Sequence, residues 1–290
     1  MPEFFNLILK KSDKALNTAN PENYKLSIQF SLDGFSFCVF DLETNRFLSI
    51  ESYSVQGKPS MEKICREFEK FVEKHEFLKS SFQEILFLVE TSKTTLIPSP
   101  LFDENEVQTF AGFNFPDDER NIFLHDRLIY PDTFNLYAVP EILSNTIQKV
   151  FPQARIICHS SALIEGLMIQ YKNIPEKKRA FVNTRTSYID IVIIEGKNLL
   201  YYNSFKYSTK EDFIYYIIFV FEQLNLNPEE TELMLSGFIE KSSSLFEMTY
   251  KYVRNIRFRE LSGNFTYSYV FDEIPSQYFT NLINSGLCEL

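Results

Sequence analysis

Two stretches of this chain, about half its length apart, follow the same order of predicted elements: three strands, a helix and a further strand. The strands alternate polar and apolar residues, whereas the helices repeat apolar residues every three or four positions. In the first stretch the elements are 26–31, 35–40, 47–55, a helix from Pro59 or Ser60, and 84–90. In the second they are 180–183, 188–194, 199–205, a helix from Thr209 to about Leu224, and 232–236. The shared order indicates an internal duplication of one α/β unit.

Local signals support individual elements. The dipeptide Asp33-Gly34 lies between two alternating runs, as in a tight β-hairpin. Thr209 is followed three residues later by Asp212, which resembles a capping box at the start of a helix. That helix is apolar on nearly all sides, so we expect it to be buried.

The chain divides into three predicted parts. Residues 1–23 form a tail or a loosely attached first strand, 24–178 a first lobe and 179–290 a second lobe. The polar stretch 173–178 marks the boundary between the lobes. Further predicted strands are 121–130, 133–139, 154–158 and 254–260, and further helices are 140–151, 160 or 161 to about 171, 241–253 and 275–284.

Charge and composition exclude some classes of protein. The chain has 29 Lys and Arg against 39 Asp and Glu, a formal charge of −10, which argues against nucleic acid as a partner. Its longest apolar run is far shorter than the ~20 residues of a membrane span, and its start lacks the features of a signal peptide. The four cysteines have neither paired nor metal-binding spacing. We therefore expect a cytoplasmic protein without a membrane span.

The segment His159–Leu167 (HSSALIEGL) resembles the small-residue connecting helix that precedes the second unit in Hsp70-like proteins. The longer stretch 135–167 is similar to the same region of pilus-assembly actin-like proteins. Together with the doubled unit, these segments resemble the actin-like ATPase superfamily, and the pattern is close to an uncharacterised bacterial family assigned that fold. The resemblance implies an α/β protein with a duplicated ribonuclease-H-like fold: two mixed β-sheets flanked by helices, with an interdomain cleft.

The resemblance also implies three loops that hold ATP and magnesium between the lobes. Such loops use glycine, because phosphate binds closely approaching backbone N–H groups, and carboxylates, because magnesium prefers oxygen ligands. The corresponding segments here are Leu32-Asp33-Gly34, 183–187 (NTRTS) and Ser236-Gly237-Phe238. They contain two glycines, and the magnesium-side carboxylates are missing or displaced. The sequence thus disfavours ATP–Mg as a cofactor.

The candidate ligand-binding residues are Asp33, Gly34, Thr184, Ser236 and Gly237. Each also has a structural interpretation: a hairpin turn for the first two, a solvated turn for the third, and the end of a strand for the last two. No residue is assigned a catalytic or metal-binding role.

Two further sets of residues allow both a functional and a structural interpretation. Arg185 can add charge to the second loop or lie in a solvated turn. Cys158 beside His159 is interpreted as a small buried residue, not as a nucleophile.

Aromatic residues are abundant, with 30 Phe and 16 Tyr. Those in 110–115 and 265–271 favour a protein partner, or else pack beneath loops. The leading hypothesis is a degenerate actin-like protein that acts as a binding or scaffold component, with nucleotide hydrolysis lost or weak. The alternative is an active ATPase or small-molecule kinase that uses Asp33 or Asp190. A filament-forming protein is a third option, and the sequence leaves the oligomeric state open.

Overall fold

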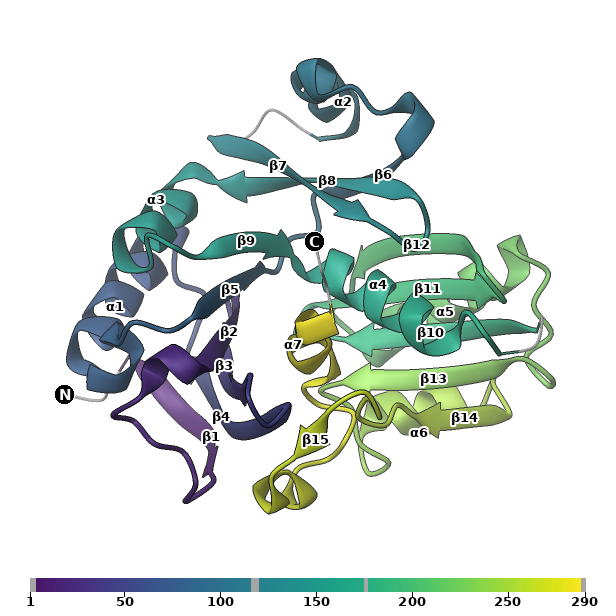
Figure 1. The fold of residues 1–290 in the computed structure, drawn as a ribbon. Helices are drawn as coiled ribbons and strands as arrows, with labels where there is room; N and C mark the ends of the chain where they lie inside the picture. Colours follow the sequence, from purple (N-terminus) through teal and green to yellow (C-terminus); the bar gives the residue numbers. More distant parts are fainter. Residues whose placement is uncertain (1–3, 116–119, 175–176, 288–290) are drawn as a thin grey trace.

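The computed structural model describes residues 4–115, 120–174 and 177–287, which form two large mixed β-sheets and one small sheet (Figure 1). The first sheet has the order β1-β4-β3-β2-β5-β9, and β15 also pairs with β4. Its strands are β1 (Phe5–Ser12), β2 (Tyr24–Ser31), β3 (Gly34–Asp41), β4 (Arg46–Val55), β5 (Glu84–Val89), β9 (Arg155–Cys158) and β15 (Thr266–Tyr267).

The second sheet has the order β12-β11-β10-β13-β14. Its strands are β10 (Lys178–Thr184), β11 (Tyr188–Glu195), β12 (Asn198–Lys206), β13 (Glu232–Gly237) and β14 (Asn255–Phe258). In each large sheet three consecutive antiparallel strands are followed by a helix and by a strand parallel to the first of the three. The predicted order of elements thus recurs, with the same pairing directions in both sheets.

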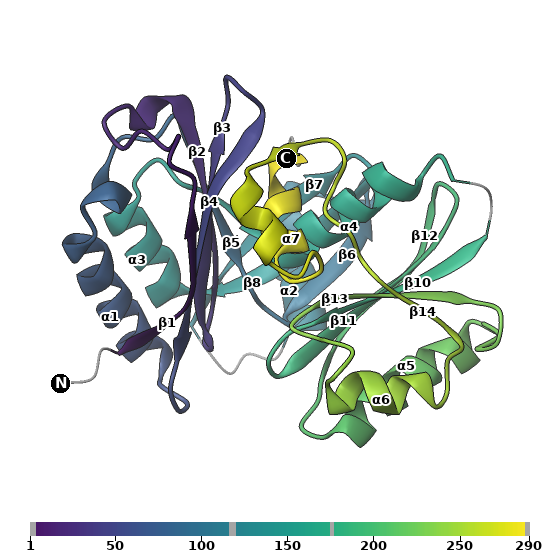
Figure 2. The same cartoon turned by 90° about the horizontal axis from the view of Figure 1, so that it is seen from below.

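Helices α1 (Met61–Lys74) and α3 (Glu141–Val150) cover the outer face of the first sheet (Figure 2). The cross-strand row Phe30, Phe35 and Tyr53 lies on that face, because partners in register project to the same side. Phe68 of α1 packs edge-on against Phe30 and Phe35, at 5.1 and 5.0 Å between ring centroids. The helix begins after Ser60, whose hydroxyl accepts a hydrogen bond from the Lys63 N–H.

Helices α5 (Lys210–Gln223) and α6 (Ser244–Tyr250) cover the outer face of the second sheet, while α4 (His159–Tyr171) and α7 (Thr280–Asn284) lie between the two sheets (Figure 2). Helix α4 is buried along nearly its whole length, as a helix between two sheets must be. The capping box at Thr209 and Asp212 is present at the start of α5. Both large cores are therefore closed by helices on their outer sides.

A third sheet of order β6-β8-β7 stands apart from the two large sheets, with α2 across it (Figure 1). Its elements are β6 (Thr94–Pro98), β7 (Asn121–Leu128), β8 (Thr133–Pro140) and α2 (Val107–Asn114). Short 3₁₀ helices occupy Pro21–Asn23, Glu76–Lys79, Ser99–Leu101, Glu104–Glu106, Tyr269–Glu273 and Ser285–Leu287.

The two ends of the described chain differ from the simplest prediction. Within the predicted segment 1–23, β1 pairs with β4 and buries Phe5, which agrees with the alternative of an attached first strand and not with a free tail; residues 1–3 lie outside the described part. The predicted second lobe, 179–290, also reaches the first sheet. Phe271, Phe279 and Leu282 bury against its inner face because that face is apolar around Cys38. The division at 178/179 stays a prediction, and residues 175 and 176 lie outside the described part.

Among the described residues, no helix has both the length and the apolar composition needed to cross a membrane.

Candidate functional site

A polar patch lies on the inner face of the first sheet, at the end that approaches the second sheet. Gln29, Ser36 and Ser52 form one cross-strand row, and Ser31 and Ser54 belong to the next row of the same face. The Ser36 hydroxyl donates to Ser52 Oγ at 2.9 Å. These five residues line a pocket of about 240 Å³, which we call the small pocket. The patch follows from strict alternation, because the intervening residues supply the aromatic row that packs on α1.

Four of the five predicted site residues line the small pocket: Asp33, Gly34, Thr184 and Gly237. The fold therefore brings the three predicted loops to one place. Ser236 does not line the pocket. It is buried, and its hydroxyl donates a 3.4 Å hydrogen bond to the side-chain oxygen of a neighbouring β10 residue.

Both glycines of the pocket are required by the backbone. Gly34 has φ +142°, and a Cβ there would lie 2.0 Å from the carbonyl oxygen of Tyr53. Gly237 has φ +81°, and its Cβ would lie 2.0 Å from the carbonyl oxygen of Thr184. Since L-residues rarely adopt such φ values and the space is filled, strand pairing alone explains why glycine occurs at both positions.

The side chain of Arg185 is buried between the two sheets and forms ion pairs in both directions. Its Nη2 and Nε donate to the Asp190 carboxylate at 2.9 and 3.0 Å. Its Nη1 lies 3.6 Å from Glu90 Oε2, at the end of β5. Ser204 Oγ accepts a further hydrogen bond at 2.8 Å. Arg185 therefore connects the sheets, and the solvated-turn interpretation of this residue is wrong.

His159, at the start of α4, completes this cluster. Its Nε2 lies 3.3 Å from the Asp190 carboxylate, and both side chains are fully buried. Burial and the nearby Arg185 oppose the charged imidazolium, but the charge of Asp190 outweighs them and raises the pKa of His159 to about 9. Burial also opposes ionisation of Asp190, yet Arg185 and His159 hold the pKa of Asp190 well below its usual range. At neutral pH the histidine is thus positive and the aspartate negative.

The cluster is balanced in charge. Burial opposes the guanidinium charge, but Asp190 and Glu90 outweigh it and raise the pKa of Arg185. Two cations, Arg185 and His159, therefore face two carboxylates, Asp190 and Glu90, which leaves no net positive charge for an anion. Cys158 is also buried, with Sγ 3.8 Å from the His159 Nδ1.

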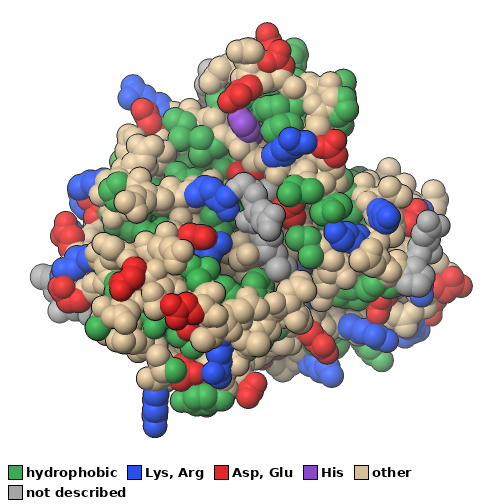
Figure 3. Space-filling model, viewed as in Figure 1, with side chains coloured by type: hydrophobic (Ala, Val, Ile, Leu, Met, Phe, Trp, Pro, Cys, Tyr) green, Lys and Arg blue, Asp and Glu red, His purple; other side chains and the backbone are tan. Residues whose placement is uncertain are grey.

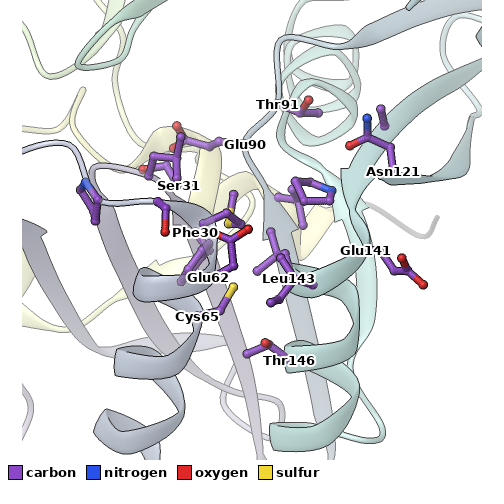
Figure 4. A pocket seen from close by; sticks show the side chains of 18 of the residues that line it. Phe30, Ser31, Glu62, Cys65, Glu90, Thr91, Asn121, Glu141, Leu143 and Thr146 are labelled. Atoms are coloured by element: carbon purple, nitrogen blue, oxygen red, sulfur yellow. The ribbon is translucent and has the colours of Figure 1, made fainter. Parts of the chain in front are cut away.

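A larger cleft of about 1220 Å³ adjoins the small pocket, and Ser31, Asp33, Glu90 and Arg185 line both cavities. Figure 4 shows its deep end, where side chains of α1 and α3 face each other. Cys65 is among them. Burial raises the pKa of its thiol to about 11, so at neutral pH the thiol stays protonated.

Sequence reasoning assigned no role to Glu90 and His159, and it considered Asp190 only as an inward-facing carboxylate. The available signal was position: Glu90 and His159 directly follow the buried ends of β5 and β9, and Asp190 lies within a mainly apolar run of β11. Asp190 does face inward, but Arg185 and His159 occupy its oxygens. In the described ranges, no three His, Cys, Asp or Glu side chains gather closely enough to hold a metal ion.

Residues 13–256 match a protein family described as "Protein of unknown function (DUF3822)". The chain belongs to this family. A Bacteroides thetaiotaomicron protein with an actin-like ATPase fold and unknown function is 24% identical to the DUF3822 chain. The TM-score is 0.80, and the match covers 94% of this chain and 99% of that one.

The PilM-PilN type IV pilus biogenesis complex contains a second similar chain. It is 10% identical, has a TM-score of 0.59, and the match covers 92% of this chain and 98% of that one. The DUF3822 chain therefore has an actin-like ATPase fold, as the sequence resemblance implied. No curated protein sequence matches it.

Proposed function

We propose that this protein is a degenerate actin-like protein that acts as a binding or scaffold component in the cytoplasm, with nucleotide hydrolysis lost or weak. The observation that carries the proposal is Arg185. It stands in the second of the three loops that would hold phosphate, and it is already neutralised by Asp190 and Glu90. A triphosphate would have to displace two carboxylates from a buried guanidinium, which is costly.

The residues around the small pocket do not fit a magnesium–triphosphate group. Gly34 and Gly237 have backbone reasons to be glycine, so neither indicates a phosphate cradle. The alternative hypothesis, an active ATPase or kinase, uses Asp33 or Asp190 to hold magnesium. Asp190 is already paired with Arg185 and His159. Only Asp33 of these two carboxylates forms no ion pair with a described residue.

Isothermal titration and phosphate release test this proposal on the full chain. We expect neither micromolar binding of ATP with magnesium nor turnover. Micromolar binding with turnover that Asp33→Asn abolishes would contradict it and favour an active ATPase or small-molecule kinase. The matched control is Glu43→Gln, an exposed carboxylate in the next turn of the same sheet that does not line the small pocket.

A protein partner also belongs to the proposal. The similar chain in the PilM-PilN complex is part of an assembly named for two proteins, which supports a protein partner here. The described surface has several exposed aromatic side chains, among them Phe113 at 84% and Tyr215 at 61%. On the face in Figure 3, acidic and basic side chains lie interspersed with hydrophobic ones. Sedimentation at raised concentration distinguishes a scaffold from a self-assembling filament, which would sediment in a concentration-dependent way.

A further inference from the structure

The small pocket is rich in hydrogen-bond acceptors. One wall consists of the polar patch on the first sheet, and α7 contributes Asn281. Asn281 is 4% exposed and its Nδ2 donates to the His159 carbonyl oxygen at 3.1 Å, yet its Oδ1 has no hydrogen-bond partner in the described structure. The Thr184 hydroxyl, 1% exposed, also lacks a described partner. Buried polar atoms are normally paired, so the acceptor Asn281 Oδ1 indicates that a hydrogen-bond donor is missing, while the Thr184 hydroxyl can either accept or donate.

The charge around the pocket is negative. Its lining residues include two carboxylates, Asp33 and Glu90, and one cation, Arg185. Arg185 is already shared between Glu90 and Asp190, whereas Asp33 forms no ion pair with any described residue. A cation is therefore attracted to this pocket and an anion is repelled.

Aromatic side chains form part of the remaining wall. Phe238, Tyr278 and Phe279 all line the pocket, and the Phe238 centroid lies 5.6 Å from that of Tyr278 and 6.1 Å from that of Phe279. Phe238 is about half exposed. Aromatic faces attract ammonium groups through the ring quadrupole, and such walls are common where organic cations bind.

We propose that the small pocket binds a small organic cation with a primary ammonium group. Asp33 neutralises its charge, Asn281 Oδ1 and the serine hydroxyls accept its hydrogen bonds, and the aromatic wall contacts its carbon chain. The pocket of about 240 Å³ holds the ammonium end and a few carbon atoms, and the adjoining cleft leaves room for a longer carbon chain. This inference rests on the proposed loss of nucleotide chemistry, because ATP would compete for the same pocket.

The experiment is a thermal-shift titration of the full chain with methylamine, putrescine and free lysine. Butane-1,4-diol is the uncharged analogue of putrescine, and inorganic phosphate and ATP with magnesium form separate arms. We expect at least one amine to raise the Tm by about 5 °C when it is present at ~100 times its Kd, while the diol and phosphate leave it unchanged.

Two variants connect the effect to the pocket. Asp33→Asn keeps the shape of this exposed side chain but removes its charge, and should weaken amine binding about threefold. Phe238→Leu keeps apolar bulk without a π face and should weaken it less. Glu43→Gln, outside the pocket, should bind as the unaltered chain does.

Three results would overturn the inference: equal shifts with the diol, an unchanged affinity in Asp33→Asn, or no shift with any of the three amines. If ATP with magnesium also gives no shift, the proposed function survives such a result. If ATP binds and is hydrolysed, the proposed function fails as well.

Discussion

The buried pair of His159 and Asp190 predicts an unusual dependence of stability on pH. The pKa of His159 is about 9 in the folded chain and 6.5 in its ordinary state. Each pKa unit corresponds to about 1.4 kcal/mol, so the pair contributes on the order of 3 kcal/mol. Because both side chains are fully buried, solvent screening does not reduce this figure. A histidine with a raised pKa stabilises the fold fully below pH 6.5, and that stabilisation is lost as the pH rises through 9.

The perturbation is His159→Gln, studied by urea unfolding between pH 6 and pH 9. A glutamine can still donate one hydrogen bond to Asp190 but has no charge to titrate. We expect the unaltered chain to lose about 3 kcal/mol more than the variant across this interval. Subtracting the free energy of unfolding of the variant from that of the unaltered chain removes the contribution of cysteine thiols, which both chains share. His125→Gln, at a partly exposed position away from Asp190, is the control and should follow the unaltered chain.

Nuclear magnetic resonance measures the pKa of His159 independently of stability. The ring C–H signals of His159 should titrate with a midpoint near 9, and they are identified by their absence from His159→Gln. A midpoint near 6.5, or parallel stability curves for the two chains, would refute the assignment of an imidazolium to this buried position.

Other substitutions test other parts of the structure by urea unfolding. Arg185→Met removes the cation that Glu90 and the buried Asp190 share, leaves Asp190 with His159 as its remaining cationic partner, and should cost about 3–5 kcal/mol; a cost under about 1 kcal/mol would contradict the ion pairs described. Gly237→Ala places a methyl group against the Thr184 carbonyl and should cost about 2–4 kcal/mol. Its control, Gly112→Ala, meets open space within a helix and should be neutral or stabilising by up to about 1 kcal/mol. Thr209→Ala removes the capping box of α5 and should cost about 1 kcal/mol, and an unchanged midpoint would argue against the cap.

Much of the fold was predictable because its signals are local. Alternation identifies the strands of both sheets, and Asp33-Gly34 marks the position of the β2–β3 hairpin, although the two loop residues are Leu32 and Asp33, and Gly34 already pairs with Ser31. The capping residues of α5 are adjacent in sequence and needed no tertiary information. The path of the C-terminal part was less predictable. Residue pairs such as Thr266 with Arg46 are far apart in sequence, and β15 has only two residues, too few to establish a period.

The candidate site was predictable in position but not in chemistry. The resemblance placed Asp33, Thr184 and Gly237 at one cleft, and they do line one pocket. The resemblance did not indicate that the Arg185 side chain is buried. A charged residue in a turn is usually exposed to solvent, and its burial can be inferred only when its ion-pair partners are known. Those partners come from β5 and β11, and no local pattern connects them.

The return of the chain's last described segment to the first sheet has a consequence for biosynthesis. The inner face of that sheet, around Cys38, Ile50 and Leu86, is sealed by residues that are synthesised long after the strands of the sheet itself. Until these residues emerge from the ribosome, the strands expose an apolar face to water, which favours aggregation. A fragment that ends at β14 should therefore need a chaperone to remain soluble, whereas the 290-residue chain should not.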